Sequence, residues 1–310
     1  MKIIKQKIGQ IKNKKIYSIE LINDNNFRLK FLNFGCYITN IIIPYNKKAK
    51  NEDVVLGYKN FKDFLKDKDY FNCVIGRVAG RISGSKFKLN NIIYKLFKNE
   101  KINHLHGGKE GFNKKFWEIK SLKKNKNLAQ CVFHYNSPHL EEQYPGNINC
   151  NIKYKLDNRN RITLEFNAKS DRDTILNLTN HNYWNFNGHK NFYSNISNHK
   201  VSIYADKFLK KNKNLIPRKK ISNLKGTKFD YRLSKEIGKN ILKKGGVDNY
   251  FIHKKSQNKL NKISEVFSPK TKMGMILFSN QPGIQFYTGN NMKYSYRGKN
   301  DRKYGKNFGL

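Results

Sequence analysis

The chain has 310 residues, of which 63 are Lys or Arg and 22 are Asp or Glu, giving a formal net charge of +41. Hydrophobic residues make up 37% and aromatic residues 13%, which is enough to build a sizeable core and excludes a largely disordered chain. No stretch approaches the roughly 18 consecutive apolar residues that a membrane-spanning helix needs, so such a helix is excluded as well.

The positive charge is spread along the chain rather than gathered in one segment. Lysine occurs throughout, and no helix-turn-helix, RNP or zinc-finger pattern accompanies it. We therefore expect no specific nucleic-acid partner. Loose attraction to polyanions at low salt is expected of any protein with this charge.

Cysteine usage and the N-terminal segment indicate the cellular compartment. The four cysteines form no C-x-x-C pair: Cys36, Cys73, Cys131 and Cys150. They fit reduced thiols in a core rather than a zinc ribbon or a redox dithiol. Residues 1–21 contain no uninterrupted apolar stretch of signal-peptide length. We therefore expect a cytoplasmic protein without a membrane partner.

Alternation of apolar and polar residues predicts β-strands along most of the chain. The clearest strands are predicted within residues 28–44, 86–96, 129–135, 148–156, 162–168, 199–205, 274–280 and 284–289. Two hairpins are expected, one joining 148–156 to 162–168 and one within 86–96, where Asn90 and Asn91 can form the tight turn. Short helices are predicted at 60–67 and 232–240, and the lysine-rich segments 120–127, 207–214 and 253–262 are interpreted as solvated loops.

Many short strands separated by Asn, Gly and Asp turns predict an all-β protein, a large antiparallel β-sandwich rather than a wound α/β fold. No internal repeat is visible, which argues against a propeller. No Pro- or Ser-rich linker divides the sequence. We therefore expect a single domain over residues 1–310.

Two segments in the first half of the chain combine cationic or imidazole side chains with glycines. "GRVAGRISG" (76–84) places Arg81 among small residues, so its guanidinium can present several donors to hydroxyl or carboxylate oxygens. In "NHLHGG" (103–108), a strand ending would project His104 and His106 to the same face. With His181 they could hold zinc through three imidazoles. The sequence offers no obvious carboxylate to orient such ligands, so we expect neither a metal nor a cofactor.

The segment "LNLTNHNYWNFNG" (176–188) surrounds His181 with side chains that donate or accept hydrogen bonds. A buried structural histidine needs only one or two partners. A crowd of polar and aromatic neighbours, including Tyr183, instead favours a histidine that transfers a proton. We expect His181 to be the centre of a functional site.

Two further segments carry candidate ligand-binding groups. "GGVDNYF" (245–251) places Asp248 after two glycines, where its carboxylate can accept hydrogen bonds from vicinal hydroxyls or form an Asx-turn. "QPGIQFYTGN" (281–290) places Gln285 on an aromatic strand, where we expect a buried amide that needs partners. The sequence contains no P-loop pattern. Together these groups predict a pocket for a polyhydroxylated ligand.

Eight segments resemble aldose 1-epimerases, also called galactose mutarotases, in order and approximate spacing. They are "FGCYITNIIIP", "DVVLGY", "GRVAGRISGSKFKLNN", "NHLHGGKEGFNKKFWE", "SPHLEEQYPGNINCNIKYKL", "NLTNHNYWNF", "GGVDNYF" and "QPGIQFYTGN". The resemblance implies a large antiparallel β-sandwich and an isomerase of carbohydrate metabolism that interconverts the α and β anomers of free aldoses such as glucose and galactose, without a cofactor. A base takes the anomeric proton, an acid protonates the ring oxygen, and the open aldehyde closes on its other face.

The resemblance also implies residue roles. His181 in "TNHNYW" matches the family's acid, and His106 in "LHGG" matches the histidine that hydrogen-bonds the substrate. The other implied substrate contacts are Arg81, Tyr183, Asp248 and Gln285. Gly80 stands where the family commonly has Asn, which is expected to alter contacts to the sugar.

The family's base is a glutamate in a C-terminal motif, and Gly309 and Leu310 match the first two residues of that motif. The glutamate and the strands after it are not among the 310 residues. We therefore expect a sandwich that lacks its C-terminal strands and an activity reduced by up to the roughly 100- to 10,000-fold that a general base contributes. The alternatives are a sugar-binding protein without catalysis and a hexose-phosphate mutarotase.

Overall fold

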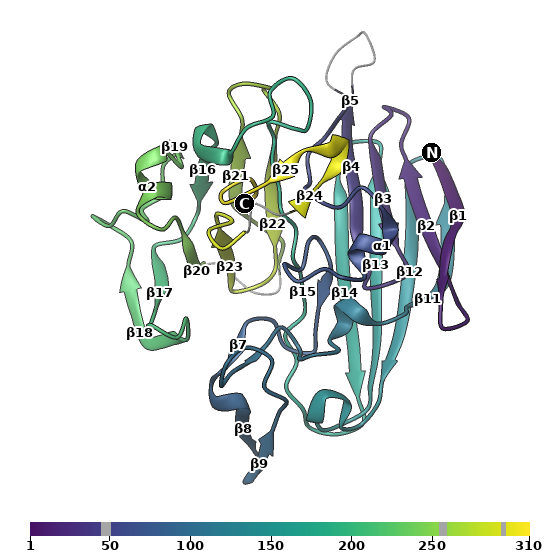
Figure 1. The fold of residues 1–310 in the computed structure, drawn as a ribbon, viewed down its shortest axis with the longest axis vertical. Helices are drawn as coiled ribbons and strands as arrows, with labels where there is room; N and C mark the ends of the chain where they lie inside the picture. The colour runs from purple at the N-terminus through teal and green to yellow at the C-terminus, as the bar shows by residue number, and fades with distance from the viewer. Residues whose placement is uncertain (45–50, 254–258, 293–295) are drawn as a thin grey trace. The chain divides into compact units, whose positions relative to one another are not determined.

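The computed structural model describes residues 1–44, 51–253, 259–292 and 296–310. Its residues group into two compact units, unit 1 (1–53 and 60–182) and unit 2 (54–59 and 183–310). Strands dominate both units (Figure 1), as the alternation predicts. The expectation of a single domain stays a prediction.

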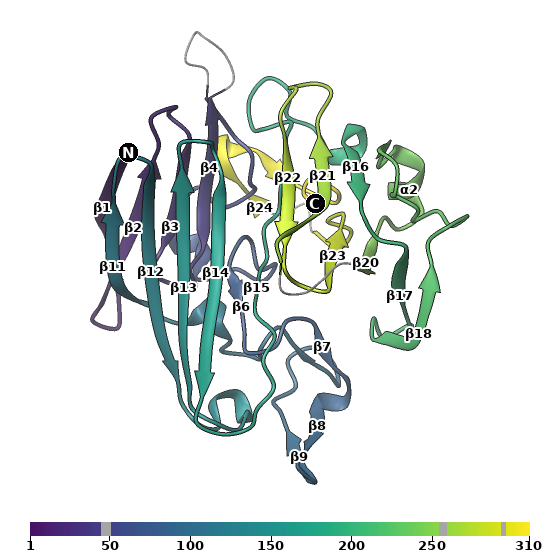
Figure 2. The same cartoon turned by 180° about the vertical axis from the view of Figure 1, so that it is seen from behind.

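Unit 1 is built on two antiparallel sheets. The first has the strand order β1 (Lys2–Ile11), β2 (Lys14–Ile22), β3 (Arg28–Leu32), β4 (Ile38–Pro44) and β5 (Asn51–Asp53). The second has the order β11 (Glu118–Lys124), β12 (Leu128–Ser137), β13 (Ile148–Asp157) and β14 (Ile162–Ser170). The purple sheet lies in front of the teal one in Figure 1 and behind it in Figure 2, so the two stack as layers. The predicted β-sandwich is confirmed.

The core of unit 1 lies between these sheets. Phe31 of β3 packs edge-on against Phe133 of β12 and Tyr154 of β13, with ring centroids 5.6 and 4.7 Å apart respectively. The predicted inward face of β13 is fully buried, whereas that of its hairpin partner β14 is only half-buried and Ala168 is exposed. The difference arises because β14 ends its sheet and packs against a strand on one edge only.

Three short strand pairs of unit 1 form the loops that carry the candidate residues. They are β6 (Val74–Ile75) with β15 (Thr179–Asn180), β7 (Arg81–Ile82) with β10 (His104–Leu105), and β8 (Lys86–Leu89) with β9 (Ile92–Lys95). Asn90 and Asn91 have φ of 49° and 64° in the β8–β9 turn, which confirms the second predicted hairpin. The helix predicted at 60–67 is confirmed as α1 (Phe61–Phe64).

Unit 2 contains two four-stranded antiparallel sheets. One has the order β19 (Lys235–Glu236), β16 (Lys200–Ile203), β21 (Asn261–Phe267) and β22 (Gly274–Ser279). The other has the order β18 (Pro217–Asn223), β17 (Lys207–Lys211), β20 (Asp248–Ile252) and β23 (Gly283–Tyr287). Unit 2 also holds a pair, β24 (Tyr296–Arg297) with β25 (Lys303–Tyr304), and a helix, α2 (Lys239–Lys243). Phe208, Phe251 and Phe286 are buried in its core.

The structure corrects two kinds of sequence prediction. The helix expected at 232–240 is wrong, because Lys235 and Glu236 pair with β16 and the helix begins only at Lys239, after Gly238 with φ of 76°. The lysine-rich segments 120–127 and 207–214 are not loops throughout, since β11 and β17 run through them. Of the segment 253–262, residues 254–258 lie outside the described part, and Asn261 begins β21.

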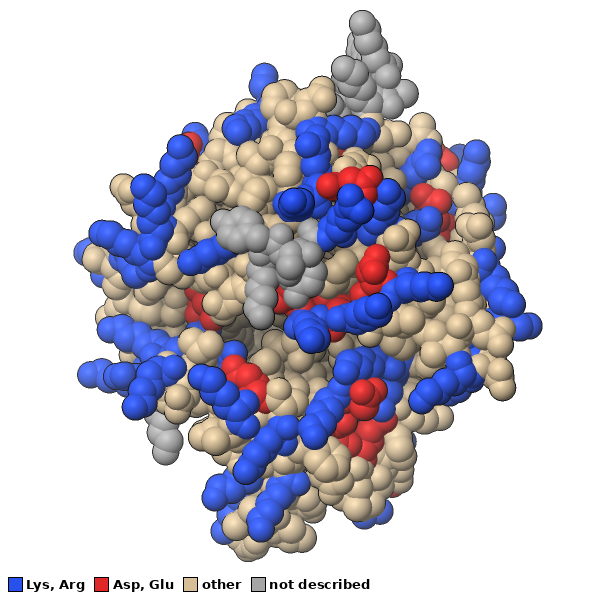
Figure 3. Space-filling model, viewed as in Figure 1, with Lys and Arg blue, Asp and Glu red and all other residues tan. Residues whose placement is uncertain are grey.

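The surface of the described residues carries its charge broadly. Lys and Arg side chains are scattered over the whole face shown in Figure 3, with a few acidic groups among them, as their distribution in the sequence indicates. None of the described helices has the length and apolar character needed to cross a membrane.

Candidate active site

Two short strand pairs of unit 1 place His181 and His106. His181 follows β15, where its N–H donates to the carbonyl of Cys73 and its carbonyl accepts from the N–H of Asn72, both at 2.9 Å. His106 follows β10, where its N–H donates to the carbonyl of Gly80 at 3.0 Å. The backbone of each histidine is therefore fixed by hydrogen bonds to residues that directly precede β6 or β7.

The two imidazoles face each other edge to face. Their ring centroids lie 5.2 Å apart with an interplanar angle of 86°. The backbone N–H of Gly80 donates to Nδ1 of His106 at 3.2 Å, so in the neutral ring the proton lies on Nε2. Burial, followed by the charges of His181 and Arg81, holds the pKa of His106 well below its usual range. His106 thus presents a neutral N–H donor.

Both glycines of "LHGG" are closely packed, Gly107 against backbone and Gly108 against a side chain. Gly107 has φ of +85°, and a Cβ there would lie 1.8 Å from the carbonyl oxygen of Gly76. At Gly108, with φ of +106°, a Cβ would lie 2.0 Å from a carboxylate oxygen of Glu142. Because His106 itself has φ of 53°, the chain leaves the extended conformation here and turns the imidazole away from the β10 alternation.

Arg81 is held by a carboxylate that the sequence motifs did not single out. Its Nε and one terminal nitrogen donate to the two oxygens of Glu100 at 3.0 and 2.8 Å. The guanidinium and, to a smaller extent, the charge of Lys101 lower the pKa of Glu100. Two N–H groups of the Arg81 guanidinium are thereby bound to Glu100. The remaining N–H groups can donate to other acceptors.

His104 does not join the imidazole pair. It is fully buried, its Nδ1 bonds the carbonyl of Phe97 at 2.7 Å, and its ring packs edge-on against Tyr144. The predicted common face of His104 and His106 is therefore wrong, because the positive φ of His106 breaks the strand. Among residues 1–44, 51–253, 259–292 and 296–310, no three or more His, Cys, Asp or Glu side chains are grouped to hold a metal ion.

Asp248 and Gln285 lie together in unit 2. They belong to neighbouring strands, since β20 pairs with β23, and Nε2 of Gln285 donates to Oδ1 of Asp248 at 2.7 Å. Nζ of Lys211 pairs with Oδ2 of Asp248 at 2.5 Å. Asp248 thus begins a strand rather than an Asx-turn. The expected burial of Gln285 is wrong: its side chain is exposed, because it alternates with the buried Phe286.

Tyr183 is buried in unit 2. Its carbonyl accepts from the N–H of Leu56 at 2.9 Å, and its ring packs edge-on against that of Tyr287 with centroids 6.0 Å apart. A Cβ added at Gly309 would lie 3.0 Å from Cδ1 of the Tyr183 ring. Tyr183 is therefore closely packed by residues from both ends of unit 2.

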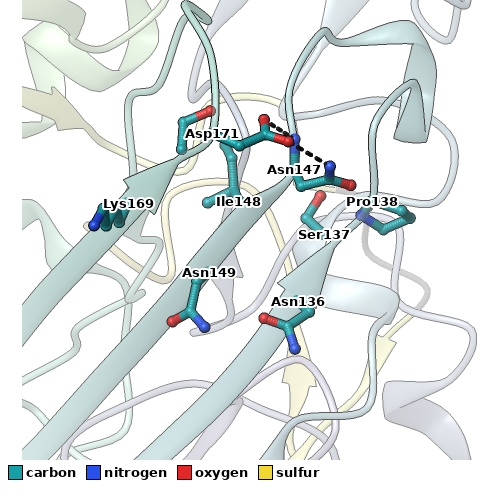
Figure 4. Close-up of a pocket in the computed structure, with 9 residues that line it drawn as sticks. Asn136, Ser137, Pro138, Asn147, Ile148, Asn149, Lys169 and Asp171 are labelled. Atoms are coloured by element: carbon teal, nitrogen blue, oxygen red, sulfur yellow. Dashed lines mark hydrogen bonds between the residues drawn. The ribbon is translucent and has the colours of Figure 1, made fainter.

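A surface hollow of about 460 Å³ lies elsewhere in unit 1, at the ends of β12, β13 and β14 (Figure 4). None of the candidate residues lines it. Its carboxylate, Asp171, already accepts from the backbone N–H and the side-chain amide of Asn147 at 2.8 and 2.6 Å. The hollow is therefore separate from the imidazole pair, and its carboxylate is already bound by Asn147.

The sequence of this chain is similar to those of known enzymes. The family model described as aldose 1-epimerase matches residues 17–310. The chain belongs to the aldose 1-epimerase family. The galactose mutarotase of Sus scrofa is 34% identical over 93% of this chain and 82% of the pig protein. The aldose 1-epimerase of Escherichia coli is 29% identical over 88% of this chain and 78% of the bacterial protein.

A solved structure of the aldose 1-epimerase family agrees with the fold. The galactose 1-epimerase of Lactobacillus acidophilus superposes with a TM-score of 0.86 at 26% identity, covering 99% of this chain and 88% of that one. The predicted family and the predicted all-β fold are both confirmed. The sequence motifs single out the two imidazoles and Arg81, whose roles stay predictions. No motif marks Glu100, which binds Arg81, or Tyr70, whose ring packs against that of His106.

Proposed function

We propose that this chain interconverts the α and β anomers of free aldoses by acid-assisted ring opening and closure. The observation that carries the proposal is the facing pair of imidazoles, His106 and His181, with their ring centroids 5.2 Å apart. A pyranose needs a proton delivered to its ring oxygen and a neutral donor to hold a neighbouring oxygen. The pair can supply both functions.

The two histidines are proposed to have different roles. Two imidazoles at this separation disfavour a double positive charge. The family resemblance assigns the general acid towards the ring oxygen to His181, and the lowered pKa of His106 fits a neutral imidazole beside it. His106 keeps its proton on Nε2 and donates a hydrogen bond to the sugar. As the ring opens, water takes the proton of the anomeric hydroxyl while His181 protonates the ring oxygen, and the reverse transfers close the ring.

Four further residues are proposed as substrate contacts on the basis of the family resemblance. The contacts of Asp248 support its role, since Lys211 pairs with one carboxylate oxygen and Gln285 donates to the other. The remaining lone pairs of these oxygens can accept hydrogen bonds from sugar hydroxyls. Arg81 is proposed to donate to a sugar oxygen from the N–H groups that Glu100 does not bind. The proposed contacts are Arg81, Tyr183, Asp248 and Gln285.

The names of the relatives favour this reaction over the two alternatives raised by the sequence. Relatives are named galactose mutarotase and aldose 1-epimerase, and neither name refers to a sugar phosphate or to binding without turnover. We therefore propose free hexoses such as galactose and glucose as the substrates. We also propose a cytoplasmic location, which the four buried free thiols support.

Polarimetry of freshly dissolved α-galactose and α-glucose tests the proposal. The chain is expected to speed the approach to the equilibrium rotation in proportion to its concentration. His181→Asn is expected to reduce that acceleration at least about 100-fold, the low end for loss of a general acid. His134→Asn is the matched control, because His134 is a half-buried histidine on β12 and its loss should leave the rate unchanged.

Three outcomes contradict parts of the proposal. A wild-type rate equal to that of buffer would contradict the enzyme. Unchanged acceleration in His181→Asn would contradict the assigned acid. Faster equilibration of glucose 6-phosphate than of glucose would contradict the choice of free sugars.

A further inference from the structure

Tyr70 lies against both imidazoles of the pair. Its ring centroid is 4.8 Å from that of His106 and 6.0 Å from that of His181, with interplanar angles of 62° and 42°. Tyr70 therefore contacts both rings of the pair. Tyrosine and histidine rings packed in this way restrain each other's rotation.

The backbone around Tyr70 is shaped by a buried carboxylate. Asp67 is 7% exposed and accepts hydrogen bonds from the N–H of Asp69 at 3.0 Å, the N–H of Phe71 at 2.9 Å and the hydroxyl of Tyr37 at 3.1 Å. Tyr70 itself has φ of 60°, a conformation that costs a bulky residue free energy. The surrounding hydrogen bonds therefore hold Tyr70 in a position that its own backbone preference disfavours.

The hydroxyl of Tyr70 is available as a donor. It makes no hydrogen bond to any residue that the structure describes, and the side chain is half-buried. Burial raises the pKa of Tyr70 to about 12, and Glu100 and Arg81 are close enough to affect it as well. At neutral pH the hydroxyl is therefore protonated, on a ring that packs against both imidazoles. Packing alone would need only the ring of a phenylalanine.

We propose that Tyr70 is a further substrate-contacting residue of this site, whose ring fixes the orientation of His106 and His181 and whose hydroxyl donates a hydrogen bond to an oxygen of the bound aldose. This inference rests on the proposed function. Its two parts separate in two variants, Tyr70→Phe, which removes the hydroxyl only, and Tyr70→Leu, which removes the ring as well.

The kinetic test compares these variants with matched changes at Tyr94. Tyr94 is also half-buried in unit 1 and packs against Phe87 with ring centroids 5.3 Å apart. Tyr70→Phe is expected to raise KM for galactose by about 2- to 10-fold, the range for losing one neutral hydrogen bond, with little change in kcat. Tyr70→Leu is expected to lower kcat at least about 10-fold through misoriented imidazoles. Tyr94→Phe and Tyr94→Leu should change neither constant.

Two measurements that do not depend on catalysis test Tyr70 independently of the proposed function. Galactose binding followed by NMR should be weaker in Tyr70→Phe than in the wild type by the same factor as KM. The histidine ring signals should show a higher pKa for His106 in Tyr70→Leu, because water reaches its ring, and no change in Tyr70→Phe.

The failures are distinguishable. A wild-type chain that binds galactose without accelerating equilibration contradicts the proposed function, while the binding comparison still tests Tyr70. Equal galactose affinity and equal KM in wild type and Tyr70→Phe overturn the hydroxyl contact. An unchanged kcat and an unchanged His106 pKa in Tyr70→Leu overturn the role of the ring.

Discussion

Gly107 and Gly80 show how one residue type is needed for two different reasons beside the imidazole pair. Their φ values are nearly equal, +85° and +83°. A Cβ at Gly107 would lie 1.8 Å from the carbonyl oxygen of Gly76, whereas a Cβ at Gly80 would meet nothing within 4 Å. A side chain at either position would cost free energy through the backbone conformation, but only at Gly107 would it also clash with neighbouring atoms.

Alanine substitutions at these two glycines should differ in stability. Gly80→Ala is expected to lower the free energy of unfolding by about 1–2 kcal/mol, the cost of a Cβ in the left-handed region. Gly107→Ala is expected to lower it by about 2–5 kcal/mol, because a steric clash typically adds about 1–3 kcal/mol. Urea denaturation measures both values, and an equal loss in the two variants would contradict the packing seen at Gly107.

At the residue scale, the sequence indicates candidate residues for the site but not the contacts between them. His106, His181 and Arg81 stand in motifs with glycine or polar neighbours, so their residue types and spacing mark them as candidate site residues. Tyr70 and Glu100 reach the same place only because the β6–β15 and β7–β10 pairs bring distant loops together. No periodicity in the sequence records such a contact.

Strand β22 presents an apolar edge that favours unintended pairing. It ends its sheet, and within the part of the chain that the structure describes no strand pairs with its outer edge. Ile276 and Phe278, on the same side of this strand, are 56% and 53% exposed. An apolar edge strand of this kind is a template for association between copies.

A single charge on this edge should reduce self-association. Phe278→Lys is expected to lower the concentration-dependent light scattering of the protein while leaving its urea midpoint nearly unchanged, because the side chain replaced is largely exposed. Leu233→Lys is the control for added charge, since Leu233 is 85% exposed and lies outside any strand. Equal scattering from Phe278→Lys and wild type would show that β22 does not drive association.

Strands were predicted well where one face is buried and poorly where lysine hides the pattern. The alternation of β13 is complete because all of its inward side chains are buried. In β11 and β17 the outward lysines lie close together in sequence. The few apolar residues between them do not form a clear alternation, so the pattern in the sequence indicates loops. The failed helix at 232–240 has the opposite cause, because strand pairing with β16 outweighs a weak local helical preference.

The whole molecule should lose stability as the pH falls below the ordinary pKa of histidine. Burial lowers the pKa of His104 and His106, and lowers that of the fully buried His199 to about 3. A folded-state pKa below the unfolded value of about 6.5 means that the unfolded chain binds more protons below pH 6.5. Their contribution is therefore complete above about pH 6.5 and is lost as the pH decreases towards the folded-state values.

This dependence can be measured between pH 7 and pH 5 at constant ionic strength. His199 alone should lower the free energy of unfolding by about 2 kcal/mol over that interval. Carboxylates with lowered pKa, such as Glu100 and Glu165, lose their contribution only nearer pH 4, so they do not obscure the effect. His199→Gln should flatten the curve, and an unchanged slope in that variant would contradict the burial of His199 as a neutral ring.

At the scale of the whole molecule, the sequence indicated the all-β class and the family but not the division into two compact units. The alternation and the ordered motifs extend along nearly the whole chain, which is why both were visible. The chain passes between units 1 and 2 at residues 53–54, 59–60 and 182–183, the last inside the motif around His181, and no change in composition marks these positions.

The position of a bound aldose tests the central claim most directly. A crystal structure of this chain with galactose is predicted to place the ring oxygen of the sugar within about 3.2 Å of an imidazole nitrogen of His181, the reach of a general acid. His106 should then donate through Nε2 to a neighbouring oxygen of the same sugar. A galactose molecule bound with its ring oxygen beyond the reach of His181 would contradict the account.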